Sequence, residues 1–182
     1  MESISWAEIV QRIEDPVIRD QAVRFQKERV GAPPYGINAD LGLRYQDVGG
    51  RIPHQLDMRE TVEDKSVHRD VTLTRRAIDA LCLNYIVVFP TPMLQLGMHP
   101  QIDMEVTLGR AYTRWLVETI LPADKRIKSF AYLPFNSPQA AIKMVEDFSD
   151  CEGIIGFCVT SARYKPVYHN DYMKTYALLE EA

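Results

Sequence analysis

The sequence predicts an α/β fold in which parallel strands alternate with crossover helices. Three short strand-like runs carry this prediction, and segments of helical periodicity flank each of them. The runs cover residues 84–89, 127–133 and 153–159. Strands that alternate with helices of about ten or more residues are typical of a parallel sheet, because a parallel connection has to cross back over the sheet. We therefore expect three parallel strands that are neighbours in the order of the chain.

Helices are predicted before, between and after these strands. Residues 1–31 are expected to form a helical pair, in which Asp15 caps the second helix and Pro16 occupies its first position. In the later helices apolar residues recur at helical spacing. They are Leu73, Ala77, Ala80 and Leu81, then Met104, Leu108, Ala111 and Trp115, then Ala141, Met144, Val145 and Phe148. We expect Asn170 to cap a final helix.

The chain between the helical pair and the alternating units is rich in glycine and proline. These residues are Pro33, Pro34, Gly36, Gly42, Gly49, Gly50 and Pro53. We predict a long loop over 32–69, and long loops within compact domains are usually functional. The whole chain, 1–182, is expected to form a single domain. In it 1–31 is helical, 32–69 is loop and 70–182 consists of successive α/β units.

Two architectures fit this pattern, an open doubly wound sheet and a (β/α)8 barrel. No glycine-rich phosphate loop follows the strands: the first continues into Pro-Thr-Pro and the third into Thr-Ser-Ala-Arg. This disfavours the nucleotide-binding form of the open sheet. A complete barrel has eight strands and about 250 residues, whereas three strands leave both edges of a sheet unpaired. We therefore predict a partial (β/α)8 TIM barrel, preceded by the helical pair and the long loop.

The composition is that of an ordinary globular protein: 46% of the 182 residues are apolar, 25% are charged, and the formal net charge is −4. A mildly acidic chain supplies no general attraction for phosphates, so we expect no nucleic-acid partner. No apolar run approaches the ~20 residues that span a bilayer, and the N-terminus has no secretory signal pattern, so we expect no membrane partner. The cysteines, Cys82, Cys151 and Cys158, form no CxxC pair, which favours a reducing, cytoplasmic location.

Polar residues that follow the strands are the first candidates for a site, because parallel α/β folds bind ligands at the carboxyl ends of their strands. His99 lies beyond the first strand, and we predict that it is catalytic, as a proton shuttle or as a donor to the substrate. The alternative for His99 is a capping or surface histidine. Asn136 follows the second strand and Arg163 the third. Both are predicted to bind substrate, and the alternative for Arg163 is simple exposure.

Two further candidates lie in the predicted loop. Arg51 can clamp a substrate carboxylate through two parallel hydrogen bonds, and His54 is close to it in sequence. The alternative for both is a solvated loop. To reach the site the loop has to fold back over the strand ends, which the adjacent Gly49 and Gly50 allow. No metal ligands are predicted, because no HxH or HxxxH pair occurs among the histidines, which are His54, His68, His99 and His169.

Several segments share core and turn positions with one known family. They are 69–76, 88–93, 108–116, 126–138, and 153–156 together with Tyr172. In these positions the chain resembles the amidohydrolase-related family of metal-dependent hydrolases, which includes aminocarboxymuconate semialdehyde decarboxylase. The resemblance covers roughly residues 45 to 182. It is a pattern of core and turn positions, so it points to the family more than to one reaction.

The resemblance implies a distorted (β/α)8 barrel that holds a divalent metal, most often zinc. Family members hydrolyse amide-like or lactone-like bonds, or decarboxylate aromatic and unsaturated acids. The family's metal ligands are an HxH on the first strand, a histidine after the fifth and an aspartate after the eighth. None of them can be placed in this sequence. By this resemblance the chain covers the N-terminal half of a barrel without its first strand, and we expect the chain alone to bind no metal.

Two hypotheses of function follow. In the first, the chain is part of a metal-dependent amidohydrolase or decarboxylase that acts on a small carboxylated or cyclic organic substrate. In the second, it is a non-catalytic barrel remnant that self-associates or pairs with a partner chain, which covers its exposed sheet edges. We also expect the chain to form a homo-oligomer.

Overall fold

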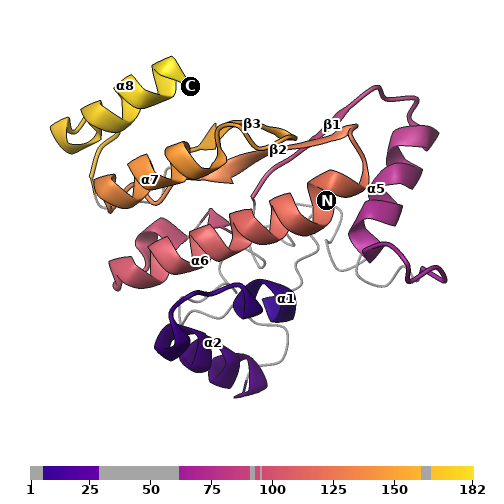
Figure 1. The fold of residues 1–182 in the computed structure, drawn as a ribbon, viewed down its shortest axis with the longest axis horizontal. Helices are drawn as coiled ribbons and strands as arrows, with labels where there is room; N and C mark the ends of the chain where they lie inside the picture. Colours follow the sequence, from indigo (N-terminus) through magenta and orange to yellow (C-terminus); the bar gives the residue numbers. More distant parts are fainter. Residues whose placement is uncertain (1–5, 29–61, 91–92, 95, 161–164) are drawn as a thin grey trace, which may run out of the picture.

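The structure, a computed structural model, describes residues 6–28, 62–90, 93–94, 96–160 and 165–182. Its strands form one open, parallel sheet in chain order (Figure 1). They are β1 (Ile86–Val88), β2 (Ile127–Tyr132) and β3 (Ile154–Cys158). The prediction of three adjacent parallel strands is confirmed, and each strand falls within its predicted range.

The helical pair is confirmed in its described part, as α1 (Trp6–Gln11) and α2 (Pro16–Glu28). The Asp15 carboxylate accepts hydrogen bonds from two backbone N–H groups in the first turn of α2, at 2.7 and 3.1 Å, so Asp15 caps α2 as predicted. α1 packs against α6 (Ile102–Trp115). The predicted loop over 32–69 lies outside the described residues as far as residue 61.

The remaining helical segments alternate with the strands. They are α5 (Arg69–Ala80), the 3-10 turn η2 (Leu96–Met98), the π turn η3 (Leu116–Ile120), the 3-10 turn η4 (Leu121–Ala123), α7 (Pro138–Phe148), the 3-10 turn η5 (Asn170–Tyr172) and α8 (Met173–Glu181). α6 connects β1 to β2 and α7 connects β2 to β3, as crossover helices do between parallel strands. None of the described helices is both long and apolar enough to cross a membrane.

The cap of the last helical segment differs from the prediction. His169, and not Asn170, occupies the cap position, where its Nδ1 accepts a hydrogen bond from the backbone N–H of Asp171 at 3.2 Å. The reason is that a 3-10 turn precedes α8, so the helical segment begins one residue earlier than a cap at Asn170 requires. Both neighbouring side chains can accept a capping hydrogen bond, and the position of the first turn decides between them.

The sheet packs against the helices through two apolar clusters. Val88, Ile127 and Tyr132 belong to a cluster with α1, α5 and α6, whereas Ala131 and Leu133 belong to a cluster with α7. Figure 1 shows α6 running beneath the sheet, with α1 and α2 below α6. Fully burying one aliphatic or aromatic side chain stabilises a protein by about 1.5–3 kcal/mol. These clusters are therefore the main favourable contribution to folding in the described part of the chain.

Tyr132 packs its ring directly against the backbone of α6 at Gly109. A Cβ atom added at Gly109 would lie 2.6 Å from Tyr132 Cδ1 and 3.1 Å from Tyr132 Cε1, which is closer than van der Waals contact allows. Tyr132 is 0% exposed, so its ring has little room to move away. Glycine is a poor helix former. Its presence within α6 is explained by the space that it leaves for the buried ring.

One face of the sheet carries exposed apolar side chains. The alternate residues Tyr85, Val87 and Phe89 are 64%, 40% and 55% exposed, and Ile155 of β3 is 50% exposed. The ring of Phe130 lies 5.0 Å from that of Phe89, measured between centroids. Successive residues of a strand point to opposite faces of a sheet. These five side chains therefore mark a face that the described helices leave uncovered, which is termed the open sheet face below.

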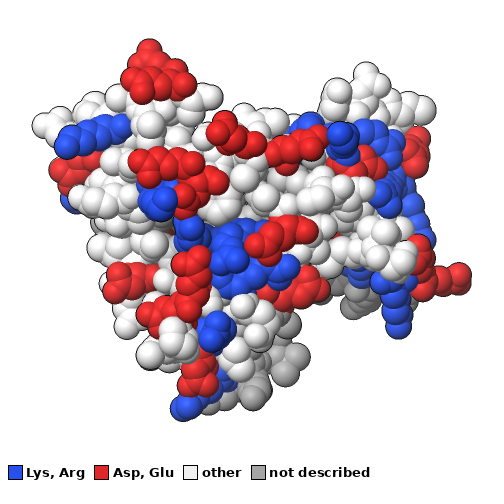
Figure 2. All heavy atoms as spheres, viewed as in Figure 1, with Lys and Arg blue, Asp and Glu red and all other residues white. Residues whose placement is uncertain are grey.

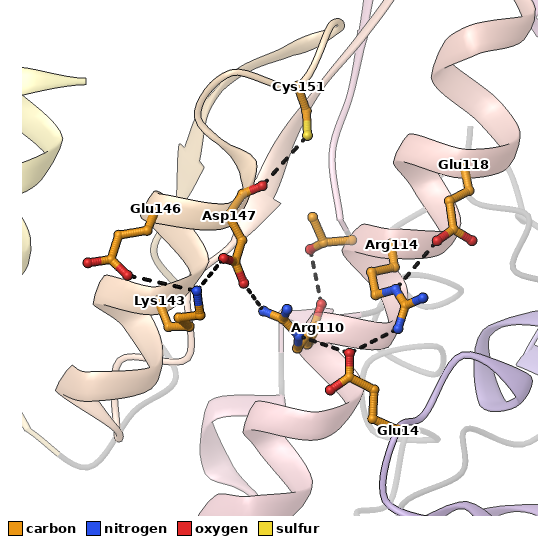
Figure 3. A network of polar contacts seen from close by, with 10 residues as sticks. Glu14, Arg110, Arg114, Glu118, Lys143, Glu146, Asp147 and Cys151 are labelled. Atoms are coloured by element: carbon orange, nitrogen blue, oxygen red, sulfur yellow. Dashed lines mark hydrogen bonds and ion pairs between the residues drawn. The ribbon is translucent and has the colours of Figure 1, made fainter.

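Ion pairs connect α6 with α7 and with the turn before α2 (Figure 3). Arg110 lies between Glu14 and Asp147, with nitrogen–oxygen distances of 3.5 and 2.6 Å, and Lys143 contacts Asp147 at 2.5 Å. The hydrogen bond from Lys143 above all lowers the pKa of Asp147; burial opposes this shift, and Arg110 adds to it. Each such pair, at least partly exposed to solvent, contributes about 0–1 kcal/mol, so the network orients the helices more than it stabilises them. Acidic and basic side chains are interspersed over the face in Figure 2.

Asp124, just before β2, is predicted to stabilise the fold in a pH-dependent way. Its carboxylate accepts hydrogen bonds from Arg126 at 2.9 and 3.1 Å and from Arg75 at 3.1 Å, and the Arg126 bonds above all hold its pKa well below the usual range. Because the pKa is lower in the folded than in the unfolded state, the stabilisation is present above about pH 4 and is lost as the pH falls toward the folded-state pKa. We expect Asp124→Asn to lower the melting temperature at neutral pH by a few degrees, and by progressively less as the pH falls below about 5. Melting curves of both proteins test this, and a difference that stays constant between about pH 5 and pH 3 would contradict it.

Candidate active site

The loops that follow β1 and β2 meet at the carboxyl ends of these strands. Asn136, in the loop after β2, donates a hydrogen bond through Nδ2 to the carbonyl oxygen of Gly97 in η2 at 2.6 Å. The same amide nitrogen donates to Oε2 of Glu105 in α6 at 2.8 Å. Asn136 therefore lies at the strand end, as predicted. It also joins the loop after β1, the loop after β2 and the start of α6.

Glu105 is a buried carboxylate at this end of the sheet. It lies in the first turn of α6 and is 1% exposed. The Tyr132 hydroxyl donates to its Oε1 at 2.9 Å, and the side chain of Thr160, just beyond β3, forms a hydrogen bond with Tyr132. Side chains from the ends of β2 and β3 thus meet the start of α6. Glu105, Tyr132, Asn136 and Thr160 are termed the strand-end cluster.

The pKa values of the strand-end cluster are shifted by burial. Removal from water raises the pKa of Glu105, and the hydrogen bonds from Asn136 and Tyr132 oppose that shift only in part. Burial, followed by the neighbouring charge of Glu105, raises the pKa of the Tyr132 hydroxyl. Tyr132 therefore keeps its proton and acts as a hydrogen-bond donor. Carboxyl groups with shifted pKa values are common at functional sites.

His99 lies in the loop between β1 and α6, where the sequence places it. It is 6% exposed, and its Nδ1 lies 3.1 Å from the backbone nitrogen of Gln101, which donates to it. The Gln101 carbonyl oxygen is also 3.1 Å from this nitrogen. This is a local contact with the residue directly before α6, where no side-chain hydrogen bond caps the helix, so it is not the cap that the alternative interpretation of His99 expects. Its predicted catalytic role is not tested by the contact and remains a prediction.

Three of the predicted site residues, Arg51, His54 and Arg163, lie outside the described residues. The structure therefore brings together Asn136 and the loop of His99, and it leaves the predicted arginine contacts as predictions. The described residue that follows Arg163 most closely is Lys165. Its ammonium group forms an ion pair with Asp171.

The described residues do not form a metal site. No group of three or more histidine, cysteine or acidic side chains is arranged to hold a metal ion in the part of the chain that the structure describes. The histidines found there, His68, His99 and His169, each accept a backbone N–H through Nδ1. The described residues therefore do not offer a set of ligands for the zinc that the family resemblance implies.

The sequence interpretation missed Glu105 and Tyr132 as site residues. The helical spacing of α6 carried a signal for Glu105. It lies four residues before Gly109 and seven before Tyr112, so it shares the buried side of the helix with them. An acidic residue at such a spacing is a candidate for a buried polar contact. Tyr132 was predicted only as part of a strand. Its hydrogen bond to Glu105 joins residues that are 27 positions apart, and local periodicity carries no information about such a pair.

The comparisons with known proteins show a likeness to solved structures only. No protein-family model matches the chain, and no curated protein matches its sequence. A crystal structure of 2,6-dihydroxybenzoate decarboxylase from Rhizobium is similar with a TM-score of 0.51 and 18% identity, over 66% of this chain and 37% of that one. A structure of 2,6-dihydroxybenzoate decarboxylase complexed with 2,6-dihydroxybenzoate has a TM-score of 0.55 and 19% identity, over 76% of this chain and 43% of that one.

At these identities the likeness concerns the fold. It agrees with the predicted fold class: parallel strands and crossover helices that match part of a larger barrel structure, with a sheet that is not closed. The chain spans less than half the length of either of these structures. The carboxyl ends of its strands, where the strand-end cluster lies, are where barrels of this kind place their sites.

Proposed function

We propose that the chain forms part of an enzyme of the amidohydrolase-related type, which acts on a small carboxylated or cyclic organic substrate by hydrolysis or decarboxylation. The observation that supports this proposal is the likeness of the chain's fold to the two decarboxylase structures. The proposed site is the carboxyl end of the sheet, around the strand-end cluster. Since the chain spans less than half of those structures, it would supply one part of such a site.

The residues of this chain have separate roles in the proposal. Arg51 and Arg163 bind a substrate carboxylate through charge-assisted hydrogen bonds, and His54 and Asn136 add polar contacts. His99 is the proposed catalytic residue, which moves a proton to or from the substrate. The described residues do not fit a divalent metal, so no step is assigned to one.

The loss of a substrate-binding arginine is predicted to weaken binding. We expect Arg163→Ala, and separately Arg51→Ala, to weaken the binding of 2,6-dihydroxybenzoate by about tenfold or more, because each removes a charged hydrogen bond. In a complete enzyme the same change is expected to lower kcat/KM by a similar factor. Isothermal titration calorimetry measures the binding.

Lys125→Ala is the matched control for these arginine variants. Lys125 is a cation too, but it precedes β2 and lies at the opposite end of that strand, and its side chain is 84% exposed. This variant is expected to bind the probe as the wild-type chain does. The proposal is contradicted if the wild-type chain does not bind the probe, or if Lys125→Ala weakens binding as much as the arginine variants do.

A second candidate function, a non-catalytic barrel remnant that self-associates, is favoured by the open sheet face. Its aromatic and aliphatic side chains suit another apolar surface. The cation beside it, Lys128, lies over the ring of Tyr85 at 6.0 Å from the centroid. A second copy of this chain presents the same apolar face. Because Lys128 already lies over the Tyr85 ring, the contact between the two copies does not depend on a negatively charged partner surface. In this candidate two copies pack through their open sheet faces.

We expect Phe89→Ser to weaken self-association by about tenfold or more, because Phe89 is the most exposed phenylalanine of the open sheet face and would be buried between two copies. Sedimentation velocity over a range of protein concentrations measures the dissociation constant. Val17→Ser is the control, since Val17 is 64% exposed on α2, away from the sheet. A wild-type chain that stays monomeric at all concentrations would rule out this candidate.

A further inference from the structure

We infer that Glu105 is a positioning residue for the proposed substrate site, because it fixes the loop that carries His99 relative to the loop that carries Asn136. The link between Glu105 and a substrate rests on the proposed function. The positioning of the two loops rests only on the hydrogen bonds that surround the Glu105 carboxylate. Glu105 does not have to touch the substrate to act in this way.

The hydrogen bonds around Glu105 connect the start of α6 with the end of β2, the loop after β2 and η2. Its Oε1 accepts from Tyr132 at the end of β2, and its Oε2 accepts from the Asn136 side chain. The backbone N–H of Asn136 is a further donor to the carboxylate. The Asn136 amide also donates to the Gly97 carbonyl. The position of η2 thus depends on where Glu105 holds Asn136.

The short loop between η2 and α6 transmits this position to His99. At one end, the backbone N–H of His99 donates to the Leu96 carbonyl at 3.0 Å, within the turn that Asn136 contacts through Gly97. At the other end, the His99 ring contacts Gln101, the residue directly before α6. Glu105 lies in the first turn of that helix. The loop of His99 is therefore attached on both sides to groups that Glu105 holds.

The position requires an acceptor at Oε2, because the Asn136 NH2 group can only donate, whereas the Tyr132 hydroxyl at Oε1 can donate or accept. The donors are the Tyr132 hydroxyl and the Asn136 amide, which are neutral groups. In Glu105→Gln one acceptor becomes an NH2 group. If that group faces the Asn136 amide, two donors oppose each other, and the Asn136 nitrogen keeps the Gly97 carbonyl but loses its carboxylate acceptor. If it faces Tyr132, the Asn136 amide keeps an acceptor, but a neutral one in place of a charged one. Either change weakens the bond that holds Asn136 to α6, so we expect Asn136 and the Gly97 turn to move in this variant.

The test compares Glu105→Gln with Asp103→Asn by NMR. Asp103 is an exposed carboxylate in the same first turn of α6, so its variant makes the same chemical change without touching the cluster. The probes are the Asn136 side-chain amide protons and the His99 ring signals. In Glu105→Gln we expect amide exchange to be at least about tenfold faster and the His99 signals to shift. In Asp103→Asn both are expected to stay as in the wild-type protein.

A third variant, Tyr132→Phe, separates positioning from general loosening of the fold. It removes the donor to Oε1 and leaves the bond between Oε2 and Asn136 in place. We expect it to lower stability while the Asn136 amide keeps its slow exchange. Native Asn136 and His99 signals in Glu105→Gln, or equal loss of protection in Glu105→Gln and Tyr132→Phe, would overturn the inference.

Two further measurements cover the remaining outcomes. If Glu105→Gln does not fold, Asn136→Ala breaks the same connection from the other side. It should then shift the His99 signals, and unchanged signals would overturn the inference.

Calorimetry with 2,6-dihydroxybenzoate tests the link to the substrate, where Glu105→Gln should weaken binding and Asp103→Asn should not. A wild-type chain that does not bind this probe contradicts the proposed function, whereas the NMR result still decides the positioning.

Discussion

Replacing Tyr132 by alanine is expected to lower the free energy of unfolding by about 3–5 kcal/mol. The ring is 0% exposed and packs against α6 at Gly109, so its removal leaves a cavity between the strand and the helix. It also leaves the Glu105 carboxylate without the Tyr132 donor. Urea unfolding, monitored by circular dichroism, measures the change. For a chain of this size the melting temperature should fall by roughly 6–20 °C.

Tyr132→Phe is the matched control, because it keeps the ring and removes the hydroxyl alone. It is expected to cost about 1–3 kcal/mol, the order of a hydrogen bond to a buried charged group. The difference between the two variants then measures the contribution of ring packing. If Tyr132→Phe were as destabilising as Tyr132→Ala, the ring would contribute nothing, and the account of the contact between β2 and α6 would be wrong.

Gly109→Ala is expected to lower the free energy of unfolding by about 1–3 kcal/mol. The added Cβ would lie 2.6 Å from Tyr132 Cδ1, so the ring or the helix has to shift. The direction of the change is informative, because in a helix without such a contact alanine is more favourable than glycine by about 1 kcal/mol. The measurement is again the urea unfolding curve.

A double-mutant cycle shows whether the Tyr132 ring causes that effect. In the Tyr132→Leu background the aromatic carbons near Gly109 are absent, so Gly109→Ala should be neutral or stabilising there. An equal cost in both backgrounds would place the origin of the strain elsewhere.

The sheet could be predicted from the sequence because the signals for its strands are local. Apolar runs between helical segments, together with the rule that parallel strands need crossovers, give β1, β2 and β3 in their observed order. The cap at Asp15 is local too, since a carboxylate followed by proline marks the start of a helix. His169 shows the limit of such signals. Two adjacent residues could cap the last helix, and only the start of the 3-10 turn distinguishes them.

The candidate site could be predicted only in part. The locations of His99 and Asn136 could be predicted because both follow strands, and the position of a strand end is set by topology, whereas their roles stay predictions. Glu105 was missed, because a carboxylate on a helix is normally exposed, and its partners are distant in the sequence. The bond between Asn136 and Gly97 joins residues 39 positions apart and arises only when the loops after β1 and β2 meet. Such contacts follow from tertiary packing and not from local pattern.

The most direct test of the account is to map where a small carboxylate binds. Backbone amide NMR signals are followed while 2,6-dihydroxybenzoate is added to the chain. We expect the shifts to concentrate in the residues after β1, β2 and β3, around His99, Asn136 and Thr160. Shifts confined to the opposite end of the sheet, around Asp124 and Gly153, or the absence of any shift at saturating probe, would contradict it.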